Sequence, residues 1–149
     1  MENRSNSDIA GRSFSSDLAF GHIGENLVVS FLDAISDGSF EVKTDRYRNG
    51  RMVVETDQNP RAAVDEDGNP IWVKSGINVT TAKWWVYVFS EYGAFVCVDT
   101  MRLKRYLRHN KKLFNENTKI NLGNSKNPAR GFLLMSNHVA DLLTGREYD

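Results

Sequence analysis

FEVKTDRYRNGRMVVETDQ, the stretch from Phe40 to Gln58, decides the fold that the sequence predicts. Both halves alternate in the manner of strands, and Asn49-Gly50 between them is a strong hairpin signal because both residues tolerate positive φ. Side chains alternate between the two faces of a strand, so a hairpin with one buried face gathers its charged positions on the other face. These positions are Glu41, Lys43, Asp45, Glu55 and Asp57.

Two interpretations of this charged face are open on the residue pattern alone. Opposed like charges across a strand pair destabilise it, and clustered carboxylates ionise together only when a cation lies among them. One interpretation is therefore a divalent-metal site with a lysine beside it. The other is a solvated hairpin face whose acids are matched by Arg46, Arg48 and Arg51.

Length and composition indicate an ordinary globular protein. The chain has 149 residues, 40% hydrophobic and 26% charged, which suits one domain with a real core. Lys plus Arg equals Asp plus Glu at 19 each, so any surface for nucleic acid has to be a local patch. The single cysteine, Cys97, excludes an intramolecular disulfide and lies in an apolar run that predicts a buried thiol.

The N-terminal part divides into an arm and a helix. Residues 1–16 are polar and aperiodic, which predicts a mobile arm. From Asp17, a plausible N-cap, apolar residues recur at helical spacing until Asp37-Gly38, and Glu25 lies at the border of this stripe. We expect residues 17–149 to form one domain. The chain shows no apolar run that we expect to span a bilayer, so the predicted location is cytoplasmic.

The remaining elements predict an α/β fold with a central mixed sheet flanked by helices. Apolar runs at 84–90 and 93–99 are typical of buried strands. A short helical turn is expected at 80–83, a polar loop at 115–130, a last strand at 131–135 and a closing helix at 137–143.

A basic helix follows the second apolar run. Thr100 is its predicted N-cap, and Leu103, Tyr106, Leu107 and Phe114 form its apolar stripe. Its other faces carry the dense basic patch of the chain, which is typical of contacts with a phosphate backbone or of a solvated helix face. The patch residues are Arg102, Lys104, Arg105, Arg108, Lys111 and Lys112.

An acid cluster with a lysine, in a chain with one basic helix, suits phosphodiester hydrolysis. Carboxylate oxygens hold Mg²⁺, which activates water and neutralises charge on the phosphate. Asp45 and Glu55 are the best ligand pair, because they flank the predicted turn on the same face.

Several motifs in this order resemble the PD-(D/E)XK nuclease superfamily, and more narrowly its small phage and bacterial members. They are a helix with Glu25, then Glu41-Val42-Lys43-Thr44-Asp45, Val54-Glu55, Ser75-Gly76-Ile77, and Thr80-Thr81-Ala82-Lys83-Trp84. The resemblance covers roughly residues 17 to 110. Each motif is short, so the resemblance depends on the order in which the motifs follow one another.

The resemblance implies a restriction-endonuclease-like core that binds Mg²⁺ or Mn²⁺ through Asp45 and Glu55, with Glu25 reaching in from the helix. The sequence departs from the family at the motif lysine, because Asp57 stands where that lysine is expected. Lys43, on the same predicted face, is the replacement we favour. Lys74 and Lys83 are weaker candidates.

A second register matches acid-x-lysine literally at Glu41-Val42-Lys43. It requires Asp33 or Asp37 as the earlier acid, and these fall in the helix and in its terminating turn. The first register therefore remains the preferred one.

The resulting functional hypothesis is a metal-dependent DNA endonuclease that acts in phage or mobile-element recombination, repair or host takeover. We expect a homodimer, because such a small nuclease has to cut two strands. One alternative is a catalytically inactive nuclease-like fold that binds DNA or protein. Another is a small interaction protein whose hairpin face binds a partner without metal.

Overall fold

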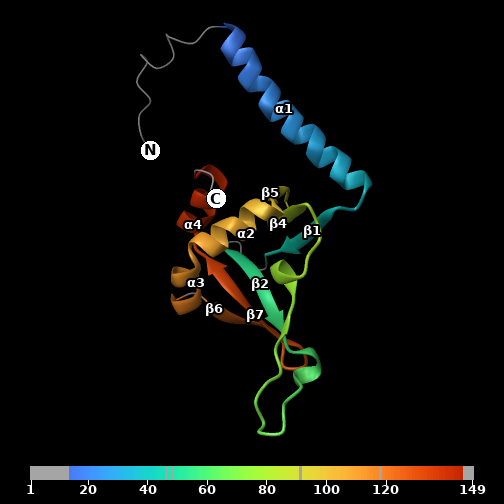
Figure 1. The fold of residues 1–149 in the computed structure, drawn as a ribbon, viewed down its shortest axis with the longest axis vertical. Coiled ribbons are helices and arrows are strands. Elements are labelled where there is room, and N and C mark those ends of the chain that lie inside the picture. Colours follow the sequence, from blue (N-terminus) through green and yellow to red (C-terminus); the bar gives the residue numbers. More distant parts are fainter. Residues whose placement is uncertain (1–13, 46, 48, 91, 118, 146–149) are drawn as a thin grey trace. The chain divides into compact units, whose positions relative to one another are not determined.

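The computed structural model describes residues 14–45, 47, 49–90, 92–117 and 119–145 (Figure 1). By its internal contacts the chain divides into two compact units, Met1–Gly38 and Ser39–Asp149. The sequence prediction drew its boundary after Ser16. Residues 14–16 belong to a helix rather than to an arm, and residues 1–13 lie outside the described residues.

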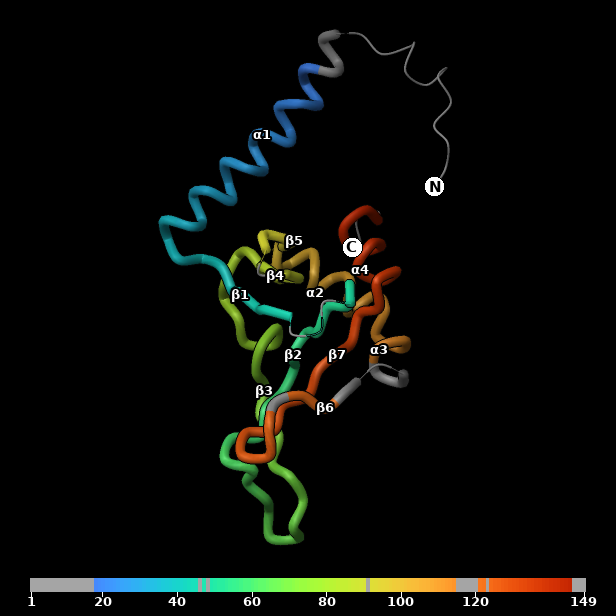
Figure 2. Tube along the Cα trace, turned by 180° about the vertical axis from the view of Figure 1, so that it is seen from behind, coloured from blue at the N-terminus to red at the C-terminus, as the bar shows by residue number. Residues whose placement is uncertain are grey.

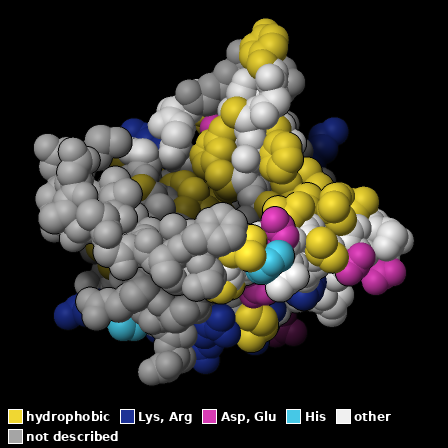
Figure 3. All heavy atoms as spheres, turned by 90° about the horizontal axis from the view of Figure 1, so that it is seen from above, with side chains coloured by type: hydrophobic (Ala, Val, Ile, Leu, Met, Phe, Trp, Pro, Cys, Tyr) yellow, Lys and Arg dark blue, Asp and Glu magenta, His cyan; other side chains and the backbone are white. Residues whose placement is uncertain are grey.

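The first unit contains one long helix, α1 (Phe14–Ser36). The predicted helix is confirmed, but it begins before Asp17, so Asp17 is not its N-cap. Eight large apolar side chains of α1 are 46% to 73% exposed, whereas Phe31 is half-buried. Figure 3 shows exposed hydrophobic side chains in groups on one face of the molecule. The eight exposed α1 residues are Leu18, Phe20, Ile23, Leu27, Val28, Val29, Leu32 and Ile35.

The composition of α1 corrects one expectation from the sequence. Leu18–Ser36 has 19 residues and a mean hydropathy of 1.3, so it is long and apolar enough to cross a membrane by length and composition. A single such helix near the N-terminus is weak evidence for a membrane span, because core helices and signal sequences meet the same criteria.

The second unit contains two sheets. The first has three strands in the order β1 (Phe40–Thr44), β4 (Trp84–Ser90) and β5 (Ala94–Asp99), with β1 parallel to β4 and β5 antiparallel to it. The second is antiparallel, in the order β3 (Val73–Lys74), β2 (Met52–Gln58), β7 (Pro128–Leu134) and β6 (Lys119–Gly123). Figure 1 shows β2 and β7 side by side, and the reverse view in Figure 2 shows β6 beyond β7.

The predicted hairpin between β1 and β2 is wrong. The tight bend exists, since Gly50 has a φ of +72° and Asn49 Oδ1 accepts a hydrogen bond of 3.1 Å from the Arg51 N–H. However, the bend joins strands of two different sheets. An Asn-Gly signal fixes only the local turn, whereas β1 pairs along its whole length with the apolar strand β4, from Phe40–Trp84 to Thr44–Val88. Parallel pairing is open to β1 because a long segment separates it from β4.

Helices and short turns complete the second unit. They are η2 (Pro60–Ala62), η3 (Gly76–Asn78), α2 (Thr100–His109), α3 (Lys111–Asn117) and α4 (Ser136–Thr144). The cap of α2 is Asp99 rather than Thr100, because the Asp99 carboxylate accepts hydrogen bonds from the N–H groups of Met101 and Arg102.

Three further boundaries differ from the sequence prediction. The single predicted basic helix is two helices, because Asn110 ends α2 and its side-chain amide donates to the Tyr106 carbonyl at 2.9 Å. The expected loop at 115–130 contains β6 and the start of β7, which pair with each other despite their polar sequence. Residues 80–83 form no helical turn.

The core of the second unit lies where both sheets meet helices α2, α3 and α4. Trp85 and Tyr87 of β4 belong to the same buried cluster as Met52 and Val54 of β2 and Leu103 of α2. The alternation of β2 is clear, since Met52, Val54 and Thr56 are buried and Val53 and Glu55 are half-buried. The α/β class is thus confirmed, with two sheets among the described strands in place of one central sheet.

Replacing Leu103 with Ala tests this core. Leu103 has no exposed surface, so we expect a loss of about 2–5 kcal/mol in the free energy of unfolding, measured by chemical denaturation. Leu113→Ala in α3 is the matched control, because Leu113 is 38% exposed. We expect its loss to be about 1 kcal/mol or less. Equal losses for the two variants would contradict the core assignment.

Candidate functional site

A pocket of about 490 Å³ brings together three of the four predicted catalytic residues. Lys43 and Asp45 come from β1 and its end, and Glu55 comes from β2. We call this cavity the carboxylate pocket. Other residues that line it include Tyr87 of β4, Asn121 and Leu122 of β6, and Asn124.

Lys43 is paired with a carboxylate of its own strand. Its Nζ lies 2.7 Å from Glu41 Oε1, and both side chains are about one-third exposed. The same Nζ lies 5.7 Å from the ring centroid of Trp85, a cation–π distance. The predicted placement of Glu41 and Lys43 on one face of β1 is therefore confirmed. The prediction that Val42 lies on the buried face is wrong, because Val42 is 48% exposed whereas Glu41 and Lys43 are half-buried.

Asp45 is fixed just past the end of β1. Its N–H donates to the Val88 carbonyl at 2.8 Å, which continues the pairing with β4, and its Oδ1 accepts from the Tyr47 N–H at 3.0 Å. The carboxylate is also close enough to Tyr87 to influence that phenol. The pKa of Tyr87 is raised, mainly by burial, partly offset by the Val53 hydrogen bond, with the negative charge of Asp45 raising it further.

The Tyr87 hydroxyl links the two sheets at the floor of the pocket. It accepts a hydrogen bond of 3.2 Å from the N–H of Val53 in β2, while Tyr87 itself belongs to β4. This contact holds the β1–β4 side, with Asp45, against the strand that carries Glu55.

Glu55 is held by the turn that follows β3. The Ser75 hydroxyl donates to Glu55 Oε1 at 2.6 Å, the length of a strong charge-assisted bond. The Ser75 N–H and the Asn78 side-chain amide both donate to the carbonyl of Thr56, at 3.0 and 2.9 Å. The Ser-Gly-Ile turn that the sequence singled out thus contacts β2 at the candidate ligand.

Two glycines approach the backbone at Glu55 more closely than any side chain allows. A Cβ added to Gly76, whose φ is +50°, would lie 2.3 Å from the Glu55 carbonyl oxygen. A Cβ added to Gly131 of β7 would lie 2.2 Å from the Val54 carbonyl oxygen and 2.8 Å from the Glu55 Cα. The backbone at Glu55 is therefore packed on two sides.

Asp57 does not join the other acids, contrary to the predicted single face. The register with β7 shifts between Glu55 and Asp57, and such a bulge re-aims the side chains beside it. The Asp57 carboxylate lies 3.3 Å from Arg130 Nε and accepts from the Thr56 hydroxyl at 2.9 Å. Position 57 therefore lines a different cavity from Glu55.

Three further predicted site residues are Glu25, Lys74 and Lys83. Glu25 belongs to the unit Met1–Gly38, where its carboxylate is 3.1 Å from His22 Nδ1. Lys74 pairs with Asp57 through the backbone of β3, and Lys83 Nζ lies 5.8 Å from the ring centroid of Trp84. Neither lysine lines the carboxylate pocket.

Two carboxylates, those of Asp45 and Glu55, line this pocket. Across the described residues, no group of three or more His, Cys, Asp and Glu side chains is placed to hold one. Two carboxylates nevertheless fit Mg²⁺, which commonly takes one or two carboxylates and completes its shell with waters and phosphate oxygens.

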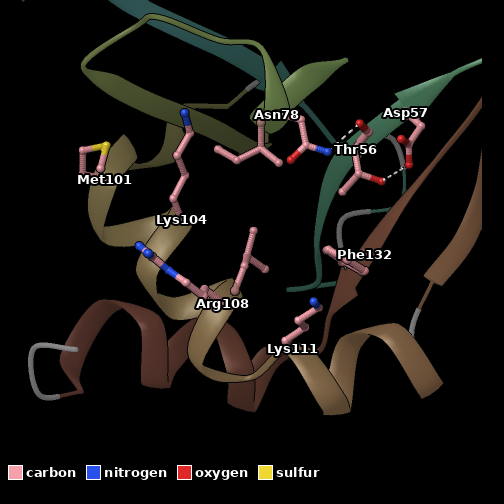
Figure 4. A pocket seen from close by; sticks show the side chains of 10 residues that line it. Thr56, Asp57, Asn78, Met101, Lys104, Arg108, Lys111 and Phe132 are labelled. Atoms are coloured by element: carbon pink, nitrogen blue, oxygen red, sulfur yellow. Dashed lines mark hydrogen bonds between the residues drawn. The ribbon is translucent and has the colours of Figure 1, made fainter. Parts of the chain in front are cut away.

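The six basic residues predicted to bind nucleic acid divide into groups. Arg102 has a structural role, because its guanidinium donates to the carbonyls of Leu142 and Gly145, both at 2.8 Å, and so ties α2 to α4. Lys104, Arg108 and Lys111 line a second cavity of about 520 Å³, which we call the basic pocket (Figure 4). Arg105 and Lys112 do not line it.

Comparisons with family models, curated proteins and solved structures find no match for this chain. The resemblance to the nuclease superfamily therefore depends on the residues described above.

Sequence reasoning gave Tyr87 no role and used Ser75 only as part of a turn motif. Tyr87 follows Trp85 by two positions in WWVYVFS, so strand alternation alone places both on the core face. The contact of Ser75 with Glu55 joins residues 20 positions apart, and no local pattern reveals it.

Gly76→Ala tests how the turn holds Glu55. Positive φ alone costs a non-glycine residue roughly 1–2 kcal/mol, and at Gly76 the new Cβ also overlaps the Glu55 carbonyl. Gly68→Ala is the matched control, because Gly68 has a φ of +81° with no atom within 4 Å of a built Cβ. We expect Gly76→Ala to lower the free energy of unfolding clearly more than Gly68→Ala does. Equal losses would mean that the turn accommodates a Cβ at position 76 with no further loss in the free energy of unfolding.

Cys97 is expected to react slowly as a nucleophile. Burial, followed by the negative charge of Asp99, raises the pKa of its thiol to about 11. Alkylation by iodoacetamide should therefore be slow at neutral pH and rise with a midpoint near 11, against about 9 in urea-unfolded protein. Because the folded state favours the neutral thiol, its contribution to stability is full below the unfolded pKa and is lost as the pH rises through the folded one. A midpoint below 9 in the folded protein would contradict this.

Proposed function

We propose that the chain is a metal-dependent DNA endonuclease with a restriction-endonuclease-like core. The observation that carries the proposal is the carboxylate pocket, which gathers Lys43, Asp45 and Glu55 although β1 and β2 do not pair. A cation and two acids in one open cavity are the groups that phosphodiester hydrolysis needs.

Each residue has a role that its surroundings support. Asp45 and Glu55 would hold Mg²⁺ or Mn²⁺, which when bound activates water and neutralises charge on the scissile phosphate. Ser75 orients the Glu55 carboxylate through its 2.6 Å bond. Lys43 lines the same cavity, where its ammonium would stabilise charge on the phosphate.

The place of Asp57 bears on the missing motif lysine. Because the bulge directs position 57 into the basic pocket, a lysine there would not share a cavity with Glu55. Lys43 is the lysine that lines the carboxylate pocket. This supports a migrated lysine rather than a simple loss.

A second candidate function is a nuclease-like binding module without activity. The 2.7 Å pair between Lys43 and Glu41 favours it, because a lysine already matched by a carboxylate stabilises phosphate charge less well. The two carboxylates from different sheets also form a smaller ligand set than three acids. Calorimetry with Mn²⁺ separates the candidates, since absent metal binding with retained DNA binding would favour the module.

Cleavage assays on single-stranded, duplex and branched DNA test the proposed activity. We expect Mg²⁺- or Mn²⁺-dependent cleavage that is abolished in Asp45→Asn and in Glu55→Gln, because each removes one of the two carboxylate ligands. Asp67→Asn, in the exposed loop after β2, is the matched acidic control and should keep wild-type activity. Cleavage that survives both ligand substitutions would overturn the site assignment.

The lysine assignment has its own comparison. Lys43→Ala should lower the cleavage rate with little change in Mn²⁺ affinity, because Lys43 acts on the phosphate rather than on the metal. Lys74→Ala, which changes an exposed lysine outside the pocket, should leave the rate unchanged. The reverse pattern would move the catalytic charge to Lys74.

A further inference from the structure

The basic pocket lies between helix α2 and strand β2, apart from the residues proposed for cleavage. In Figure 4, Met101, Lys104 and Arg108 come from α2 on one side, and Thr56 and Asp57 of β2 lie on the other. Lys111 of α3 and Phe132 of β7 close the pocket below Thr56 in this view. The residues that line it and those that line the carboxylate pocket form two separate sets.

The charge of this pocket is positive. Lys104 and Arg108 are one helical turn apart on α2, and Lys111 begins α3. Asp57 is the one acid in the lining, and its carboxylate is already bound to Arg130 at 3.3 Å. Within the described parts of the chain, Arg108 and Lys111 have no carboxylate within 4.0 Å, and Lys104 Nζ reaches only the Thr80 carbonyl at 3.5 Å.

The floor of the pocket is apolar. Ile77 and Leu107 are 3% and 7% exposed, and the ring of Phe132 packs against the same core. Asn78 stands at the edge with its amide fixed by the 2.9 Å bond to the Thr56 carbonyl. Cations from two helices around the pocket, an apolar floor with an aromatic ring, and a fixed amide are groups that can bind an amphiphilic anion.

A nucleotide has the matching chemistry. Its phosphate needs convergent cations, arginine above all, and its base stacks on apolar or aromatic side chains while an amide reads its edge. A cavity of about 520 Å³ is also within the usual size range for small-ligand sites.

We propose that the basic pocket binds a nucleotide, with its phosphate at Arg108 and Lys111 and its base over Ile77 and Phe132. The nucleotide is either free or the 5′-phosphorylated end of a DNA strand, since both present the same chemistry. The inference does not rest on nuclease activity, because none of these residues lines the carboxylate pocket.

Calorimetry on the full chain without divalent metal tests the proposal, with deoxyadenosine monophosphate as the probe. We expect one site per chain, and a Kd that rises by about tenfold in Arg108→Gln and in Lys111→Gln, because each loses a charge-assisted contact. Lys112→Gln is the matched control: it removes a neighbouring exposed cation that does not line the pocket. An equal loss in Lys112→Gln, or no binding by the wild-type chain, would overturn the proposal.

Three further ligands define what the pocket recognises. Inorganic phosphate should bind more weakly than the nucleotide, and equal affinity would overturn the role of the apolar floor. A 5′-phosphorylated oligonucleotide that binds as tightly as the mononucleotide identifies a strand end, whereas preference for the mononucleotide identifies a free ligand. A 5′-hydroxyl oligonucleotide that binds equally well through Arg108 and Lys111 would overturn the pocket in favour of a general backbone contact.

Asp45→Asn keeps this test independent of the proposed cleavage. It should retain nucleotide affinity, because Asp45 lies in the other cavity. Loss of cleavage with retained nucleotide binding supports both assignments, whereas retained cleavage without nucleotide binding overturns this one alone.

Discussion

Both candidate sites depend on the two-faced burial of β2. Met52 and Val54 must point into the core, where they have no exposed surface, so Val53 and Glu55 have to point the other way. Tyr87 then reaches across from the first sheet and accepts a hydrogen bond from the Val53 N–H. This hydrogen bond, together with the shared core, holds the acid just past the end of β1 near the acid on β2. The bulge at Thr56 next turns the strand, so that Asp57 lines the basic pocket instead.

The two cavities differ in the sign of the charge that predominates in their linings. In the carboxylate pocket, acids from two different sheets lie near one lysine, which a cation would stabilise. In the basic pocket, cations from α2 and α3 stand over an apolar floor, which an anion would stabilise. Both sets of charges are tolerated because these side chains are half-buried or exposed, so that water screens them. A ligand of the opposite charge in either cavity would increase the stability of the fold by mass action.

The sequence predicted the elements better than their partners. Apolar patterns located α1, β4, β5 and α2. In β4 and α2 the pattern reflects burial, whereas most large apolar side chains of α1 are exposed. The pairing of β1 with β4 left no such pattern, and the Asn49-Gly50 signal pointed to the wrong neighbour. The sequence nevertheless predicted that Lys43, Asp45 and Glu55 lie close together. The predicted reason was partly wrong, because two different sheets, and not one hairpin, bring the three residues together. The bulge that separates Asp57 from Glu55 depends on pairing with β7, far away in the sequence.

The close approach of Gly76 and Gly131 to Glu55 separates geometry from chemistry at this position. Both glycines pack directly against the backbone at residue 55. This close packing fixes the path of the chain there without the Glu55 side chain. The Glu55 carboxylate, in turn, is oriented by the hydrogen bond that it accepts from the Ser75 hydroxyl. Residue 55 can therefore be substituted to place a new side chain in the cavity while the surrounding strands keep their course.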